Sequence, residues 1–110
     1  MASTQRSLER ALDLYRRGNP DAARREAEAA LAAAPADGRL LHFLGTLACR
    51  TGALAEGVRW FERALELDPG DFGSRCNLAK AQVALGRPEE ALRLCAGQPG
   101  GATGELLRLQ

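Results

Sequence analysis

The sequence predicts an all-α solenoid in which antiparallel helix pairs stack along one axis, and two observations support this fold class. Gly18, Gly52 and Gly86 recur at intervals of 34 residues, and Pro35 and Pro69 repeat the same interval. A period of about 34 residues is the length of one helix–turn–helix unit. Ala and Leu dominate the apolar 45 % of the chain and aromatic residues make up only 5 %, which favours closely packed helices over sheets. The 110 residues therefore hold about three such units.

The helices of the first unit are predicted from apolar residues that recur every three or four positions. Over residues 4–17 these side chains fall on one helix face. Gly18 ends this helix, and Pro20 begins the next one, because proline is tolerated in the first turn of a helix. Pro35 stops the Ala-rich segment that follows, so the second helix is expected at 20–34.

The same cycle of helix, glycine turn and helix recurs twice more. Gly52 and Gly86 mark the turns, and the breaker sequence Asp68-Pro69-Gly70-Asp71 separates the second unit from the third. We expect the remaining helices at residues 38–51, 54–67, 72–85 and 88–96. The whole chain, 1–110, is thus one repeat domain with units at 4–37, 38–71 and 72–103.

The third unit is interrupted early by glycine and proline, and residues 104–110 start to look helical again. Six or seven residues are too few for a stable isolated helix. Leu106, Leu107 and Leu109 have no following unit to pack against, and exposed apolar area is unfavourable in water. We therefore expect this C-terminal edge to fold back or to form a homo-oligomer.

The three units share a pattern of large, small and turn-forming residues. The middle unit carries it best, through Leu44-Gly45, Gly52, Phe61, Ala64, Leu65 and Leu67-Asp68-Pro69. The other units match it at Leu14, Gly18, Ala23, Ala30, Leu31 and Pro35, and at Leu78-Ala79, Gly86, Ala91 and Leu92. Through these residues the chain resembles the tetratricopeptide repeat (TPR) family, and in particular the leading repeats of bacterial TPR proteins. The resemblance implies a right-handed solenoid with a concave face lined by the first helix of each unit.

The sequence also departs from the family pattern. Gly57 stands where Ala is common, at a cost of up to about 1 kcal/mol, and we expect it to serve close helix packing rather than a hinge. Small residues at recurring positions, such as Ala11 and Gly45, allow helix axes to approach to about 8 Å. Arg10 and Arg75 replace apolar packing residues, so the first and third units are expected to be looser.

Composition and motifs give no support to enzymatic, metal or cofactor chemistry. A single histidine, His42, and three cysteines without a C-x-x-C pair leave neither a zinc site nor a catalytic triad. Glu89-Glu90 is explained by its place in a first helical turn. The net charge of +1 disfavours nucleic acid, and no segment is apolar enough to span a membrane. The expected protein is cytoplasmic and not an enzyme.

The resemblance places a largely polar and basic set of side chains on the concave face. The candidate partner-binding residues are Arg16, Arg39, His42, Arg50, Asn77 and Lys80. The carboxylate clamp that some relatives use to bind a peptide's terminal carboxylate is matched only at Asn77 and Lys80, so a full clamp is not expected. Trp60 is expected to pack on the outer side.

Three functional hypotheses remain. The leading one is a protein–protein interaction scaffold whose rigid groove binds an extended or helical segment of a partner. The alternative is the N-terminal repeat stack of a larger enzyme, resembling sulfotransferase or glycosyltransferase fusions, whose catalytic domain lies elsewhere. The third is self-association through the open end of the stack.

Overall fold

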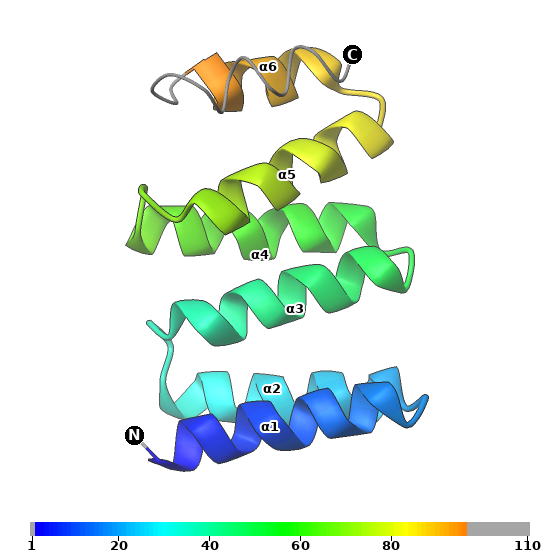
Figure 1. The fold of residues 1–110 in the computed structure, drawn as a ribbon, viewed down its shortest axis with the longest axis vertical. Helices are drawn as coiled ribbons and strands as arrows, with labels where there is room; N and C mark the ends of the chain where they lie inside the picture. The colour runs from blue at the N-terminus through cyan, green and yellow to red at the C-terminus, as the bar shows by residue number, and fades with distance from the viewer. Residues whose placement is uncertain (1, 97–110) are drawn as a thin grey trace.

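A computed structural model describes residues 2–96, which form six α-helices and no strand. The helices are α1 (Ala2–Arg16), α2 (Pro20–Ala33), α3 (Gly38–Arg50), α4 (Leu54–Leu67), α5 (Phe72–Ala84) and α6 (Pro88–Ala96). Each bound lies within two residues of the one expected from the sequence. Successive helices run antiparallel and stack along the long axis of the molecule (Figure 1). The all-α solenoid is therefore confirmed.

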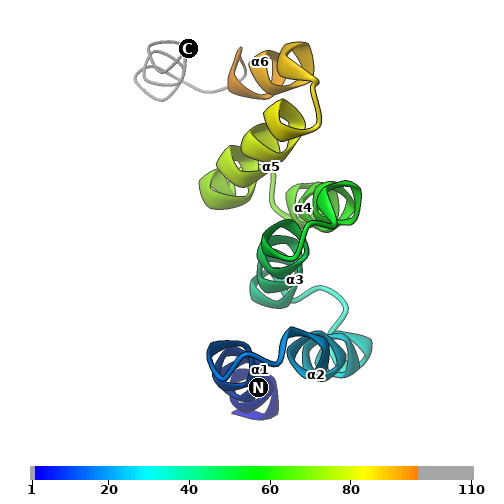
Figure 2. The same ribbon diagram turned by 90° about the vertical axis from the view of Figure 1, so that its right-hand side faces the viewer.

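The solenoid is elongated, with extents of 39 × 26 × 18 Å. Figure 2 shows α1, α3 and α5 along one side of the stack and α2 and α4 along the other. In that view α3 is set back relative to α1 and α5, which makes the side formed by these three helices concave. The first helices of the pairs therefore share one face, as the family resemblance implies.

The periodic glycines form the turns within the three helix pairs. Gly18, Gly52 and Gly86 have φ values of 84°, 92° and 80°, a region that residues with a Cβ rarely adopt. In each turn, the residue after the glycine donates its N–H to the carbonyl five positions earlier: Asn19 to Leu14, Ala53 to Ala48 and Arg87 to Gln82. This is the Schellman arrangement, which satisfies carbonyls at a helix end.

Polar side chains cap α2, α3 and α5 at their N-termini. The Asn19 carboxamide oxygen accepts from the backbone N–H of Ala22 at 3.3 Å. Asp37 caps α3 in the same way by accepting from Arg39 at 3.0 Å, and Asp71 caps α5 by accepting from Ser74 at 3.1 Å. Such caps satisfy N–H groups that have no partner within the helix.

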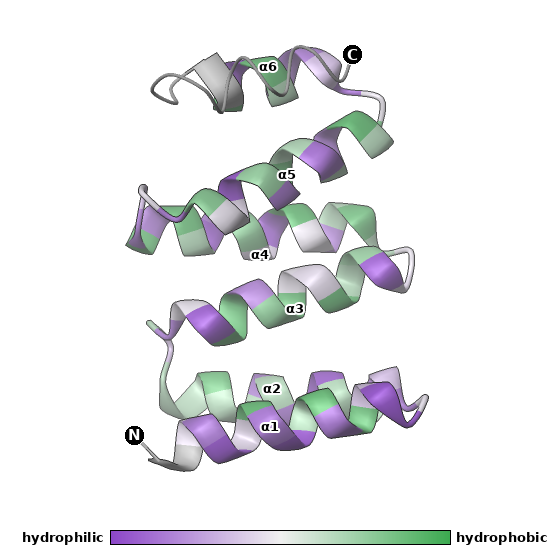
Figure 3. Ribbon diagram, viewed as in Figure 1, coloured by the Kyte–Doolittle hydropathy of each residue, from purple (hydrophilic) through white to green (hydrophobic). Residues whose placement is uncertain are grey.

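The core lies between the two layers of helices and is made of the apolar stripe of each helix. Figure 3 shows hydrophobic and hydrophilic residues alternating along the helices, as expected when each buries one face. Leu40, Leu41, Leu44 and Phe61 are at most 1 % exposed. Phe61 and Val58 of α4 pack with Leu78 of α5, so the second and third pairs share an apolar cluster.

Two glycines allow α3 and α4 to approach closely. A Cβ on Gly45 would lie 2.7 Å from the nearest ring atom of Phe61, and a Cβ on Gly57 would lie 2.5 Å from Cys49 Sγ. Neither position has room for a methyl group without movement of its neighbours. Close packing is therefore the role of Gly57, as expected from the sequence.

The two arginines at apolar family positions have polar partners. Arg10 forms an exposed ion pair with Glu26 at 3.1 Å. Arg75 donates to the carbonyl oxygens of Pro69 at 2.6 Å and Leu94 at 3.4 Å, which connects α5 to the preceding linker and to α6. That the first and third units are looser stays a prediction.

Trp60 is partly buried on α4 and packs against the core, with the Arg63 guanidinium 5.2 Å from its ring centroid. The expected helix at 104–110 and the leucine edge at Leu106, Leu107 and Leu109 lie outside the described residues, so they stay predictions.

Candidate functional site

Two hollows open on the concave side and meet at Thr46. The α1–α3 hollow has a volume of about 500 Å³, and the α3–α5 hollow has a volume of about 240 Å³. The first is lined by Leu8, Leu12, Gly38, Arg39, His42, Phe43, Thr46 and Asp71. The second is lined by Thr46, Cys49, Arg50, Leu54, Phe61, Asn77, Lys80, Ala81 and Ala84. We refer to the two together as the groove.

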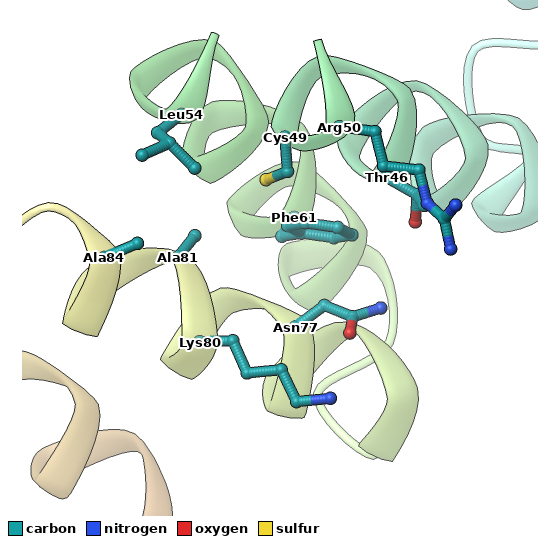
Figure 4. Close-up of a pocket in the computed structure, with 9 residues that line it drawn as sticks. All are labelled: Thr46, Cys49, Arg50, Leu54, Phe61, Asn77, Lys80, Ala81 and Ala84. Carbon is teal, nitrogen blue, oxygen red and sulfur yellow. The ribbon is translucent and has the colours of Figure 1, made fainter. Parts of the chain in front are cut away.

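The α3–α5 hollow has an apolar side and a polar side (Figure 4). The apolar side carries Leu54, Ala81 and Ala84, and the ring of Phe61 lies between the two sides. The polar ends of Thr46, Arg50, Asn77 and Lys80 lie together on the opposite side. This arrangement suits a ligand that combines an apolar side chain with a charged or hydrogen-bonding group.

The polar side of the α3–α5 hollow is cationic. None of the residues that line it is acidic. Within residues 2–96, the ion pairs involve neither Arg50 nor Lys80, and the guanidinium of Arg50 makes only a long contact of 3.5 Å with the Tyr15 hydroxyl. Two positive charges without a nearby carboxylate attract an anionic group.

The charge of the α1–α3 hollow is largely compensated. Arg39 forms an ion pair with Asp37 at 3.3 Å and donates to the Gln5 side-chain oxygen at 2.6 Å. Burial raises the pKa of Asp37, but hydrogen bonds from Arg39 outweigh it and hold the pKa below its ordinary value. The remaining lining, which includes Leu8 and Leu12, is mainly apolar. This hollow therefore suits an apolar side chain better than an anion.

A hydrogen-bonded network connects the floors of the two hollows. The Ser74 hydroxyl donates to Asp71 Oδ2 at 2.7 Å, His42 Nδ1 lies 3.2 Å from Ser74 Oγ, and Asn77 Nδ2 lies 3.4 Å from His42 Nε2. Ser74 is fully buried, and the imidazole meets the Phe61 ring edge-on with centroids 5.6 Å apart. His42 of α3, the N-cap residue Asp71, and Ser74 and Asn77 of α5 are thus linked in one series.

The network does not have the geometry of an activated nucleophile. The only hydroxyl proton of Ser74 goes to Asp71 rather than to the histidine, and the oxygen is buried. Burial raises the pKa of Asp71, but hydrogen bonds from Ser74 and the nearby His42 outweigh it and hold the pKa below its ordinary value. Burial also raises the pKa of the Cys49 thiol, which lowers its reactivity.

Five of the six predicted partner-binding residues line the groove, and Arg16 does not. Arg39 and His42 line the α1–α3 hollow, and Arg50, Asn77 and Lys80 line the α3–α5 hollow. Arg16 is exposed at the end of α1 and lines neither hollow.

Sequence reasoning missed Ser74 and the role of Asp71 beside His42. The signal that was available is the spacing of Asp71 and Ser74, which is typical of a helix N-cap and its third helical residue. This spacing predicts the helix cap, but it does not predict that His42, which belongs to another helix pair, lies against Ser74.

Over residues 2–96, no group of histidine, cysteine and acidic side chains could hold a metal ion. In the same part of the chain, no helix has the length and apolar character needed to cross a bilayer.

Comparisons with known proteins agree with this architecture. A family model described as tetratricopeptide repeat matches residues 8–72, and a second model with the same description matches residues 60–93. No curated protein matches the sequence.

Similar solved structures include the first TPR of Spaghetti (RPAP3), bound to the HSP90 peptide SRMEEVD. It has a TM-score of 0.84 and 19 % identity, and the match covers 97 % of this chain and 90 % of that chain. A tetratricopeptide repeat protein from Parabacteroides merdae has a TM-score of 0.80 and 27 % identity, with coverage of 87 % and 39 %. A mutant O-GlcNAc transferase from Thermobaculum terrenum has a TM-score of 0.78 and 28 % identity, with coverage of 96 % and 19 %. The chain thus spans well under half of each of these two bacterial proteins.

Proposed function

Because the chain belongs to the tetratricopeptide repeat family, we propose that it is a protein-interaction scaffold whose groove binds a segment of a partner protein. The observation that carries the proposal is the α3–α5 hollow, which is open on the concave side and has one apolar and one cationic side. A similar fold holds a peptide in the Spaghetti structure, and that peptide, SRMEEVD, is acidic and contains valine and methionine.

The preferred partner segment carries an acidic side chain next to an apolar one. The acidic group pairs with Arg50 and Lys80, while the apolar group packs against Leu54 and Phe61. A second apolar side chain enters the α1–α3 hollow. Because the helices are already packed in the free protein, binding requires little ordering of the scaffold.

The proposal is tested with labelled SRMEEVD as a probe peptide and with SRMQQVN, which lacks the acidic side chains, as its match. We expect the acidic peptide to bind more tightly, with an affinity that falls as salt rises, because exposed charges are screened over about 10 Å at 0.1 M. The double variant Arg50→Glu, Lys80→Glu should lose binding by more than about tenfold, since each ion pair at the rim contributes on the order of 1 kcal/mol and repulsion adds to the loss.

The matched control is Arg25→Glu, Arg59→Glu, which makes the same change of charge at exposed positions on α2 and α4. This control should bind the acidic peptide as the unmodified protein does. Equal binding by the groove variant and the control variant would contradict the proposal, provided that both retain the helical circular dichroism of the parent.

A second candidate function is favoured by the similarity to the O-GlcNAc transferase, of which the chain covers 19 %. In that case the repeats present a substrate segment to a catalytic domain in a longer protein. The complete open reading frame decides whether such a domain is present. We further propose that the protein is cytoplasmic and that its partner is a protein rather than a nucleic acid. We also propose that it self-associates at the C-terminal edge. Light scattering on a variant in which Leu106, Leu107 and Leu109 are replaced by polar residues tests this self-association.

A further inference from the structure

The positions of the protons in the groove network follow from its distances. Asp71 is ionised, so its oxygen 2.7 Å from Ser74 Oγ can only accept, and it takes the single hydroxyl proton of Ser74. Ser74 Oγ must therefore accept from His42 Nδ1, which lies 3.2 Å away and carries a proton. In the neutral imidazole, Nε2 then has no proton and accepts from the Asn77 amide at 3.4 Å.

This assignment decides which atom of Asn77 remains for a ligand. Because one N–H of Asn77 is directed to His42 Nε2, the amide Nδ2 faces the histidine and Oδ1 is left without a hydrogen bond from residues 2–96. Asn77 lines the α3–α5 hollow beside Lys80 and across from Arg50. In this state Asn77 offers an acceptor beside the donors of Arg50 and Lys80.

Resting on the proposed function of the groove, we propose that His42 is a positioning residue that decides how Asn77 faces a bound segment. With a neutral imidazole, Asn77 presents Oδ1 and can accept an N–H of the ligand. A proton on Nε2 would face the Asn77 NH₂, so the amide turns over and places Oδ1 on the imidazolium. The Asn77 amide then presents its NH₂ donors to the hollow beside Arg50 and Lys80, which favours a carboxylate.

Charged and titratable groups from several elements surround His42. From α5 it faces Ser74 and Asp71, whose carboxylate stays ionised, and Arg39 lines the same hollow. Elements α1 and α4 contribute Leu8, Leu12 and Phe61, which do not titrate. The Cys49 thiol of the neighbouring hollow stays neutral, because burial raises its pKa. Imidazole is the side chain whose charge ordinarily changes between pH 5 and 8.

The free protein tests this inference without any ligand. The chain has one histidine, so its ring signals in long-range ¹H–¹⁵N correlation spectra belong to His42. At pH 8 we expect the tautomer with the proton on Nδ1. On acidification, the side-chain amide resonances of Asn77 should shift with the same midpoint as the imidazole. A dominant Nε2–H tautomer, or Asn77 resonances that do not follow the imidazole, would overturn the inference.

Two variants separate positioning from simple packing. Ser74→Ala removes the acceptor for Nδ1–H, so the preference for that tautomer should be lost while helical circular dichroism is retained. His42→Gln should abolish the pH-linked shift of Asn77. If Ser74→Ala keeps the parental tautomer preference, then the network does not set the orientation.

Binding supplies the second readout. At constant ionic strength, SRMEEVD should bind the unmodified protein about three- to tenfold more tightly at pH 5.5 than at pH 8, and His42→Gln should reduce this ratio to near one. A ratio that His42→Gln leaves unchanged contradicts the inference. A peptide that binds at neither pH contradicts the proposed function instead, and the resonances of the free protein then decide the role of His42 on their own.

Discussion

Gly45 packs against the ring of Phe61, and we predict that the effect of Gly45→Ala on stability depends on whether this ring is present. In Gly45→Ala, the added Cβ would lie 2.7, 2.8 and 2.9 Å from three carbon atoms of the ring. Carbon atoms pack best at about 3.5–4.0 Å, so the ring or the helices must move. Phe61 of α4 is 1 % exposed, so a movement of its ring disturbs the packing around it.

Two opposing effects set the magnitude. Replacing a helical glycine by alanine stabilises the helix by up to about 1 kcal/mol. Overpacking a core typically costs about 1–3 kcal/mol. The free energy of unfolding should therefore fall, with a net loss of up to about 2 kcal/mol in an otherwise unmodified protein.

The same substitution should be stabilising when the ring is shortened. In a Phe61→Leu background, the two nearest ring atoms, Cε1 and Cζ, are absent. The methyl group that Gly45→Ala adds then fills space, and the helix preference of alanine contributes up to about 1 kcal/mol. The double-mutant cycle should give a coupling of about 1–3 kcal/mol between the two positions.

Urea denaturation followed by helical circular dichroism measures all four proteins of the cycle. Gly38→Ala is the matched control, because it lies in the first turn of α3 and a Cβ there meets no atom within 4 Å. That control should leave stability unchanged or raise it. If Gly45→Ala stabilises both backgrounds to the same extent, α3 and α4 are not held in contact by this glycine and the packing argument is wrong.

Other predictions follow from the same structure. Phe61→Ala should cost about 3–5 kcal/mol in urea denaturation, and a loss below about 1 kcal/mol would show that the ring is not in the core. Gly52→Ala should lower stability by about 1–2 kcal/mol because of its φ of 92°, and a neutral result would contradict the left-handed turn. The helix-capping carboxyls of Asp37 and Asp71 have pKa values below the ordinary value of 3.8. Their contribution to the free energy of unfolding is therefore complete above pH 3.8 and is lost as the pH falls through the lowered pKa values. The urea midpoint should therefore drop on acidification below about pH 4, and it should drop less in Asp71→Asn. If that variant has the same pH profile as the unmodified protein, the Asp71 cap does not contribute to the pH dependence of stability.

The sequence by itself determined the helices, the turns and the side of each helix that is buried. These features depend on local rules that repeat: Gly18 and Gly52 adopt a positive φ, Pro20 starts a helix, and apolar spacing selects one face. Because a solenoid unit contacts only its neighbours, local rules applied three times also predict the overall architecture. The phase of the repeat likewise placed Arg50 and Lys80 on the concave side.

Only the tertiary structure decided how side chains from different helix pairs meet. The contact of His42 with Ser74 joins residues 32 positions apart, and no local propensity encodes it. The position of Arg16 outside both hollows was likewise seen only in the structure. The repeat period predicts which face a residue occupies, whereas the rotation and approach of adjacent helices depend on side-chain volumes at their interface, such as the absent Cβ of Gly45 against the ring of Phe61.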